Sequence, residues 1–320
     1  MIRIAVPMLA ALLSTAPAWG QSPPADRFVT LGTMGGPVPS TTRSQPANVL
    51  LRGKDAYLID CGDGAVEQLA KAGILLPQVR AVFLSHLHVD HTGGLAAVLG
   101  LRNQTNVRPV LTVYGPPGTK ALVAGIVASM EPAARAGYGI PGQPWAPPAS
   151  TVTVVEMADN TRLSIDGMTV TAAQNTHYDF APGSAEDVAY KSLSLRFDLP
   201  GRSIVYTGDT GPSAAVERLT KGADLLVSEM IDVEGTLEVV RRITPNMPAV
   251  AQQQLIRHLT THHLTPKDVG TLAARAGVKS VAITHFAAGA DNSARAAGYL
   301  RTIAETYRGP VRIAKDLDHF

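Results

Sequence analysis

The sequence is poor in cysteine and in runs of like charge. Its 320 residues include one cysteine, Cys61, so no disulfide can form within the chain and the core must supply the stability. The formal net charge is +2, and the longest basic run is the pair Arg241 and Arg242. Proteins that follow a phosphate backbone usually carry a dense basic stripe. The charge pattern therefore argues against a nucleic-acid partner.

Two catalytic motifs are also missing from the sequence. It contains no Gly-x-Ser-x-Gly segment, which argues against a serine hydrolase. It contains no glycine-rich phosphate loop, which argues against a nucleoside triphosphatase.

The apolar stretch within residues 1–20 is too short to span a membrane. Arg3 precedes an apolar stretch from Ile4 to Leu13, about ten residues, whereas a bilayer core requires roughly 20. Small residues follow at Ala18 and Gly20, which is typical of a secretory signal. We expect cleavage near Gly20 and a mature single domain of residues 21–320. This predicts a periplasmic or secreted protein with no membrane attachment after cleavage.

Strand patterns alternate with helix patterns along the rest of the chain, which indicates an α/β fold. Residues 48–60 read as a hairpin that turns at residues 52–54. A helix is best specified after Thr265, which is a good N-cap, and Gly277 ends it. Residues 130–150, rich in Pro, Gly and Ala, are expected to form a loose insertion.

Three of the nine histidines and one aspartate lie within six residues, at positions 86–91. The apolar run 81–84 predicts a strand that ends just before this cluster, and residues 92–94 predict the start of a helix. Imidazole and carboxylate groups are the ligands that borderline divalent cations such as zinc prefer. Crowded imidazoles offer no stabilisation without a metal. We therefore interpret the cluster as metal ligands: His86, His88, Asp90 and His91.

Three later residues occupy equivalent places. His177, Asp209 and His285 each follow an apolar run, as His86 does. Because the ends of neighbouring strands meet at one edge of a sheet, we expect all of them to converge there. Together with the cluster they complete seven ligands, enough for two ions.

The segment His86-Leu87-His88-Val89-Asp90-His91 matches the H-x-H-x-D-H signature of the metallo-β-lactamase superfamily. The later Thr-His, Gly-Asp and Thr-His pairs, and the early Leu-Ile-Asp-Cys-Gly-Asp-Gly segment, resemble the other signature segments of that family in the same order. The resemblance implies an α/β fold of the αββα type, with two mixed β-sheets packed face to face and helices on the outer faces. It also implies two divalent metal ions, zinc above all, at one edge of the sheets.

The resemblance assigns a role to each ligand. It places His86, His88 and His177 on the first ion, Asp90, His91 and His285 on the second, and Asp209 between the ions. It implies hydrolysis by a bridging hydroxide, and it makes Asp60 a structural residue beneath the site. Cys61 is interpreted as a small buried residue and not as a ligand or nucleophile.

Two further residues resemble signature segments of the tRNA 3′-processing endonucleases, or RNase Z. Glu229 ends one apolar run, and His263 precedes the helix that begins after Thr265. The resemblance implies that Glu229 orients His263, which assists the leaving group, so the predicted catalytic residues are Asp90, Glu229 and His263. The alternative is that His263 only caps a helix, beside His258 and His262.

The expected substrate is a small anionic ester, either an aryl sulfate or a phosphodiester. The signal pattern and the lack of a Gly- and Lys-rich arm in residues 130–150 argue against tRNA processing, and exported relatives with similar segments resemble type III arylsulfatases and phosphodiesterases. No nucleic-acid partner is expected, and a homodimer is left open. One alternative is a lactonase or β-lactamase acting on an acyl carbon, and another is a non-catalytic metal-binding module. Candidate residues of the pocket wall are Tyr178, Phe180, Met230, Met247 and Trp145.

Overall fold

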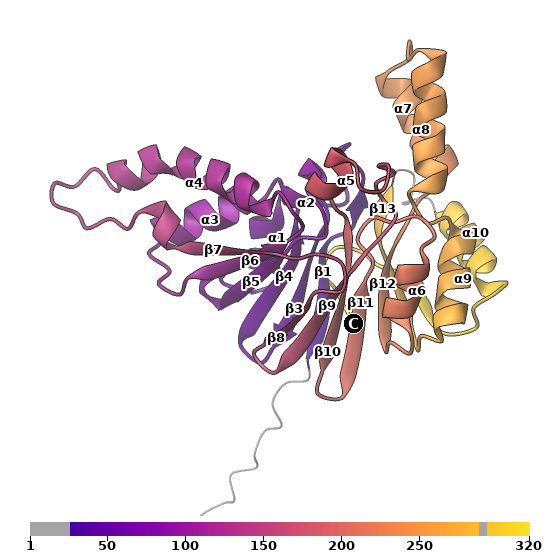
Figure 1. Ribbon diagram of the computed structural model, residues 1–320, viewed down its shortest axis with the longest axis horizontal. Helices are drawn as coiled ribbons and strands as arrows, with labels where there is room; N and C mark the ends of the chain where they lie inside the picture. The colour runs from indigo at the N-terminus through magenta and orange to yellow at the C-terminus, as the bar shows by residue number, and fades with distance from the viewer. Residues whose placement is uncertain (1–25, 288–292) are drawn as a thin grey trace, which may run out of the picture.

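The computed structural model describes residues 26–287 and 293–320. In this part of the chain two β-sheets lie face to face, and helices cover the outer face of each (Figure 1). Both sheets contain parallel and antiparallel pairs. The predicted αββα sandwich of two mixed sheets is therefore confirmed.

The first sheet comes mainly from the N-terminal half of the chain. Its strand order is β15-β1-β3-β4-β5-β6-β7, antiparallel up to β4 and parallel beyond it. The predicted hairpin is β3–β4, which turns at residues 53 and 54. The strands are β1 (Arg27–Gly32), β3 (Ala47–Arg52), β4 (Asp55–Cys61), β5 (Val79–Phe83), β6 (Leu111–Gly115), β7 (Val152–Glu156) and β15 (Asp318–His319).

The second sheet comes mainly from the C-terminal half. Its order is β14-β13-β12-β11-β10-β9-β8, and the short strand β2 also pairs with β13. The strands are β2 (Met34–Gly35), β8 (Arg162–Ile165), β9 (Met168–Gln174), β10 (Leu193–Leu199), β11 (Arg202–Tyr206), β12 (Leu225–Met230), β13 (Val281–Ala287) and β14 (Val311–Ile313).

Apolar side chains that alternate between the two faces of each sheet form three apolar layers. In β4, Ala56 and Leu58 face the helices of the first sheet, whereas Tyr57 and Ile59 face the second sheet. This follows from the two-residue repeat of a strand, in which successive side chains point to opposite faces. The inner layer fills the space between the sheets, and the two outer layers attach the helices.

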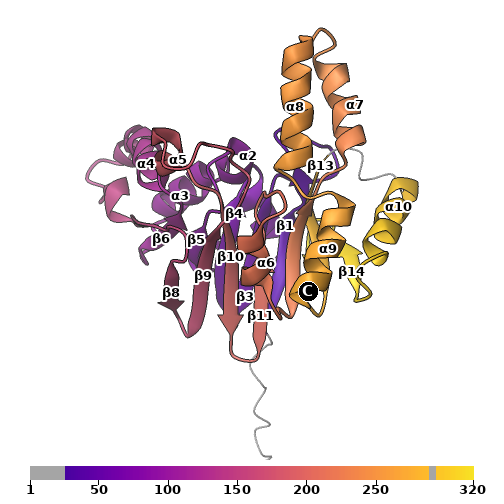
Figure 2. The same cartoon turned by 45° about the vertical axis from the view of Figure 1, so that its right-hand side comes forward.

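Helices α1, α3 and α4 pack on the first sheet, and α6, α9 and α10 pack on the second (Figures 1 and 2). The bounds are α1 (Ala65–Lys71), α3 (Leu95–Gln104), α4 (Thr119–Ala136), α6 (Ala214–Thr220), α9 (Pro266–Ala276) and α10 (Ser293–Ala304). Shorter turns lie in the connections: η1 (Leu76–Gln78), α2 (Val89–Thr92), η2 (Pro148–Ser150) and α5 (Ala185–Ala189). None of the helices in the described part is long and apolar enough to cross a membrane.

The predicted loose insertion at residues 130–150 is wrong in its first third. Met130 to Ala136 form the last two turns of α4, and Pro132 lies inside this helix. Alanine, the residue with the best helix propensity, follows Pro132 at positions 133, 134 and 136, and Met130 is buried against the first sheet. The prediction depended on a composition rich in Pro, Gly and Ala, and the alanines in it favour a helix.

A helical hairpin of α7 (Val233–Ile243) and α8 (Ala249–Thr261) projects beyond the sheets (Figure 2). Asp232 caps α7, and a small apolar cluster around Ile231 and Leu259 joins the base of the hairpin to the sandwich. The hairpin connects the strand that carries Glu229 to the turn that carries His263, so it stands beside the predicted site.

Candidate metal centre

The predicted metal ligands lie at one end of the two sheets, where α2 and α5 are drawn in Figures 1 and 2. β5 ends three residues before His86, β9 ends three residues before His177, and β11 ends three residues before Asp209. His285 lies within β13, and α2 carries Asp90 and His91. Packing of the sheets face to face brings these strand ends together from both halves of the chain.

His86, His88 and His177 direct ring nitrogens at one point. Nδ1 of His88 lies 3.1 Å from Nε2 of His86 and 3.2 Å from Nε2 of His177. Protons cannot pair all three nitrogens, because one N–H donates to one acceptor. A divalent cation can accept a lone pair from each of them.

In His86 and His177, the hydrogen-bond partner of Nδ1 decides which ring nitrogen carries the proton. Ser85 Oγ donates its only proton to Asp60 at 2.8 Å, so toward Nδ1 of His86, at 3.0 Å, it can only accept. The carbonyl of His262, 3.2 Å from Nδ1 of His177, can also only accept. Both rings therefore carry the proton on Nδ1 and present a lone pair on Nε2. Burial lowers the pKa of His177 to about 3, which favours this neutral form.

Asp60 supports the cluster from within the core. Its carboxylate accepts hydrogen bonds from Ser85 N at 2.7 Å, Ser85 Oγ, His91 Nδ1 at 2.8 Å and Tyr206 Oη at 2.7 Å. It is fully buried, and its backbone lies in the left-handed region at φ 55°, which aspartate tolerates better than most residues. Asp60 thus occupies the supporting position that the sequence indicated.

Asp90, His91 and His285 form a second group beside the first. Nε2 of His91 and Nε2 of His285 each lie 3.6 Å from Oδ2 of Asp90. Nδ1 of His91 keeps the proton that it donates to Asp60, so Nε2 is the nitrogen that presents a lone pair once it loses its own proton to make way for a cation.

Asp209 lies between the two groups. Its Oδ2 is 3.2 Å from Nε2 of His285 and 3.9 Å from Nε2 of His177, and its Oδ1 is 3.3 Å from Nε2 of His91. Burial alone would raise the pKa of Asp209, but the charges of His285 and His91 hold it well below its usual range.

Unpaired atoms at this point fit bound cations. Among the described residues, the buried Oδ1 of Asp209 and Nε2 of His91 have no hydrogen-bond partner. Leaving such groups unpaired costs about 1–3 kcal/mol each, and a cation between them satisfies both. The donor set of nitrogen and carboxylate oxygen suits the two divalent ions, and the structure brings all seven predicted ligands together.

Glu229 and His263 form a buried pair beside the two groups. Nδ1 of His263 lies 2.8 Å from Oε2 of Glu229. Burial alone would lower the pKa of His263, but the charge of Glu229 and this hydrogen bond raise it to about 9. The ring centroids of His263 and His177 are 5.0 Å apart. Because Glu229 occupies Nδ1, Nε2 of His263 is the atom that can meet a substrate.

His258 is a further histidine at the centre that the sequence analysis treated only as a neighbour. Its ring lies 5.1 Å from that of His263 and 5.5 Å from that of His177, between centroids. It reaches this position from α8. The sequence analysis did not predict the α7–α8 hairpin, so it did not place His258 at the site.

Of the residues suggested for the pocket wall, Tyr178 and Phe180 lie at the centre, whereas Met230 and Met247 do not. The Tyr178 ring lies 5.2 Å from the ring of His177, and the Phe180 ring lies 5.5 Å beyond it, so both lie beside the centre. Met230 is fully buried in the outer layer of the second sheet, and Met247 lies in the turn between α7 and α8.

Cys61 is fully buried, and burial raises the pKa of its thiol, as expected of an unreactive residue.

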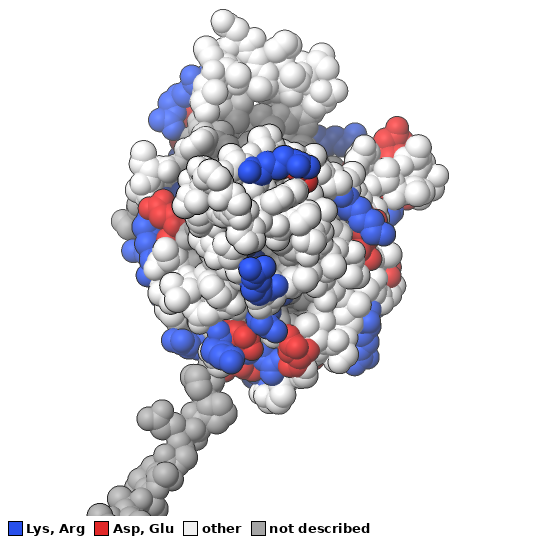
Figure 3. Space-filling view, turned by 90° about the vertical axis from the view of Figure 1, so that its left-hand side faces the viewer, with Lys and Arg blue, Asp and Glu red and all other residues white. Residues whose placement is uncertain are grey.

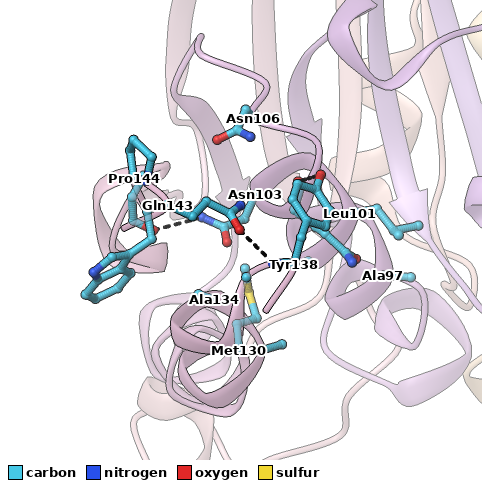
Figure 4. Close-up of a pocket in the computed structure, with 15 residues that line it drawn as sticks. Ala97, Leu101, Asn103, Asn106, Met130, Ala134, Tyr138, Gln143 and Pro144 are labelled. Carbon is cyan, nitrogen blue, oxygen red and sulfur yellow. Dashed lines mark hydrogen bonds between the residues drawn. The ribbon is translucent and has the colours of Figure 1, made fainter. Parts of the chain in front are cut away.

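Trp145, suggested as a wall residue, lines a separate cavity of about 390 Å³ instead. This cavity lies between α3, α4 and the segment after α4 (Figure 4). Tyr138 and Gln143 close it through a hydrogen bond of 2.8 Å, and the guanidinium of Arg135 lies 4.7 Å from the Trp145 ring. None of the predicted site residues is among the described residues that line it.

The model of the β-lactamase superfamily domain matches residues 56–286. The chain belongs to the metallo-β-lactamase superfamily. Ribonuclease Z of Mycolicibacterium paratuberculosis (strain ATCC BAA-968 / K-10) is 31% identical over 298 residues, which cover 90% of this chain and 96% of the relative. The protein is therefore a metallo-β-lactamase-fold hydrolase of the RNase Z-like branch.

Solved structures share the fold of this metallo-β-lactamase-superfamily chain. The metallo-β-lactamase fold protein YhfI from Bacillus subtilis aligns with a TM-score of 0.66 at 16% identity, covering 92% of this chain and 98% of that one. Zn²⁺-bound PqqB from Methylobacterium extorquens aligns with a TM-score of 0.60 at 16% identity, covering 92% and 99%. At these identities the likeness shows the fold alone. Divalent metals are a property of the superfamily, and the two histidine groups are compatible with them.

The comparisons contradict the prediction of a periplasmic or secreted protein. Relatives that match 81–90% of the chain are named ribonuclease Z, which describes enzymes of RNA and not of an exported substrate. The prediction depended on residues 1–20, and these lie outside the described residues. A short apolar stretch after one positive charge was too weak a pattern to establish export.

Proposed function

We propose that this hydrolase cleaves small anionic esters, phosphodiesters first and aryl sulfates second, with two zinc ions held by the seven converging side chains. His86, His88 and His177 would hold one ion, Asp90, His91 and His285 would hold the other, and Asp209 lies where it could serve both. The Zn²⁺-bound structural neighbour and the mixed imidazole and carboxylate donor set support zinc. The ribonuclease Z relatives support a phosphodiester bond.

One observation carries the proposal: Asp209 lies between two groups of imidazoles, and a buried Glu229–His263 pair adjoins them. Two bound cations supply a nucleophile from water at neutral pH and neutralise charge on the oxygens of the ester. The protein contributes the rest. Glu229 fixes the ring of His263, and Nε2 of His263 donates a hydrogen bond to the departing ester oxygen.

The face that carries α3 and α4 offers no binding path for a long nucleic acid. On the face that carries α3 and α4, uncharged residues predominate, and the few Lys and Arg side chains are scattered among Asp and Glu (Figure 3). A groove that follows a polyanion needs a continuous basic path, which this face does not provide.

A substrate panel tests the proposal. The zinc-loaded protein is assayed on bis-p-nitrophenyl phosphate, p-nitrophenyl sulfate, a lactone and a cephalosporin. We expect turnover of the phosphodiester, and we expect Asp209→Asn to lower kcat/KM at least 100-fold. The variant His263→Gln should slow esters with poor leaving groups more than activated ones. Preferential turnover of the lactone or cephalosporin, unaffected by His263→Gln, would instead identify an acyl hydrolase.

A further inference from the structure

Three aromatic rings lead from the metal centre to the surface. Tyr178 lies 5.4 Å from the ring of His88 and 5.2 Å from that of His177, between centroids. Phe180 lies 5.5 Å from Tyr178, and Tyr190, at the end of α5, lies 6.2 Å from Phe180. We propose that Tyr178, Phe180 and Tyr190, here called the aromatic platform, bind a planar aromatic group of the substrate. This inference rests on the proposed function, whose substrate class it narrows.

Exposure along the platform increases with distance from the centre. Tyr178 is half-buried, Phe180 is 38% exposed and Tyr190 is 52% exposed. Val188, on α5, and Val89, between two predicted ligands, are 65% and 76% exposed. An apolar surface of this extent beside a polar site is stabilised when a ligand covers it.

Four of the charged side chains near the platform are paired with each other, whereas Glu186 of α5 is exposed. Lys191 lies 2.6 Å from Asp187, and Arg257 of α8 lies 2.7 Å from Asp179. These pairs neutralise the rim of the platform. The surface that remains offers ring faces and the carboxylate of Glu186, so it suits an uncharged planar ring better than a second phosphate.

The platform is held in place before any ligand arrives. Ser184 caps α5 through Asp187 N, and the Asp187 carboxylate accepts a hydrogen bond of 2.9 Å from Gly183 N. Nδ1 of His262 donates to the carbonyl of Thr176 at 2.9 Å, which ties the start of the segment to the end of α8. A preorganised surface loses less entropy when it binds.

The distance of the platform from the metal ligands determines which part of the substrate it contacts. An ester whose tetrahedral anion sits against the metal ligands extends its organic arm by a few ångströms, and Tyr178 is the ring at that distance. Stacked rings lie about 4.5–7 Å apart between centroids, so an arm placed beside Tyr178 also reaches Phe180. Aryl groups and nucleobases share this planar chemistry, and they differ in whether a sugar separates the ring from the anion.

Binding of stable anions tests the platform without turnover. Calorimetry on the zinc-loaded protein compares phenylphosphonate with methylphosphonate, and thymidine 5′-phosphate with deoxyribose 5-phosphate. We expect the ligand with a ring to bind about tenfold more tightly in at least one pair. Phe180→Ala and Tyr190→Ala should reduce that ratio severalfold and leave the ligand without a ring unaffected. In each pair, the ratio compares the affinity of the ligand with a ring to that of the ligand without one. A larger ratio for the phosphonates, reduced in the two alanine variants, identifies an aryl group as the natural ligand. A larger ratio for the sugar phosphates, reduced in the same way, identifies a nucleobase.

Controls separate the platform from other effects. Tyr190→Phe keeps the ring and should keep the ratio, and Tyr138→Ala removes an exposed tyrosine at the separate cavity and should change nothing. A ratio that is unchanged in Phe180→Ala and Tyr190→Ala, with binding intact, would overturn the platform alone. Absence of binding by all four anions would overturn the platform together with the proposed function.

Discussion

The carboxylate of Asp60 accepts more hydrogen bonds than any other side chain described at the centre. One carboxylate accepts from a backbone N–H, a serine, a tyrosine and a histidine that belongs to the second ligand group. It therefore joins the core between the sheets to the metal site. Its left-handed backbone places both oxygens where these donors converge, so the longer side chain of glutamate cannot replace it without loss.

Asp60→Ala should lower both stability and metal affinity. The side chains of Ser85, Tyr206 and His91 lose their acceptor, at about 1–3 kcal/mol each, and His91 also loses the partner that fixes its tautomer. We expect urea unfolding to show a loss of at least 3 kcal/mol, about the cost of one donor per side chain, and equilibrium dialysis to show about tenfold to 100-fold weaker zinc binding. The matched control is Asp63→Ala, an exposed acid in the same segment, which should stay within about 0.5 kcal/mol of the parent.

Helix α9 shows how one element fixes a catalytic side chain. The hydroxyl of Thr265 accepts from Asp268 N at 3.4 Å, and the Asp268 carboxylate accepts from Thr265 N at 3.1 Å. This capping box begins the helix two residues after His263. The cap therefore also orients the turn that brings His263 to Glu229.

Thr265→Ala removes one half of the capping box. It should cost about 1 kcal/mol, which lowers Tm by about 2–4 °C in a domain of this size. Thr271→Ala, in the middle of the same helix, should leave Tm unchanged or raise it slightly, because alanine has the higher helix propensity. Differential scanning calorimetry compares the two variants. Equal losses would show that Thr265 acts only as an ordinary helix residue.

Local patterns explain which elements could be predicted from the sequence. Residues 266–276 carry their cap, apolar face and stop within one segment, so α9 was predicted correctly. Helix α7 has a comparable pattern, with Val233, Leu237 and Val240 on one side and Asp232 as cap, but this signal was overlooked. Without the α7–α8 hairpin, the position of His258 could not be derived.

At the scale of the whole molecule, the centre is assembled from both sheets. The first sheet supplies the cluster at residues 86–91, and the second supplies His177, Asp209 and His285. His177, Asp209 and His285 could be proposed from their places after apolar runs, and the other four ligands from their crowding at residues 86–91. Distances near 3–4 Å between them could not, because they depend on how two sheets of distant sequence pack. The same is true of the unpaired atoms on Asp209 and His91.

Metal removal should destabilise the entire sandwich, because a ligand that binds only the folded state shifts its stability. At a free zinc concentration 100 times Kd, the gain is about 2.7 kcal/mol per site. We expect a chelator to lower Tm and added zinc to restore it. Asp209→Asn should respond to zinc much less. Identical Tm values for the parent protein with and without chelator would contradict a metal centre at this position.

The C-terminal residue is paired with β1: Phe320 N donates to Phe28 O at 2.9 Å, and Phe28 N donates to Phe320 O at 3.1 Å. In a variant that lacks residues 1–25, a short peptide could bridge residues 26 and 320, and new ends could be opened in the largely exposed turn at residues 244–248. Such a circular permutant would read His263 and His285 ahead of His86. Its chemistry would be kept, since it depends on where the strands end in space and not on the order in which the ribosome makes them.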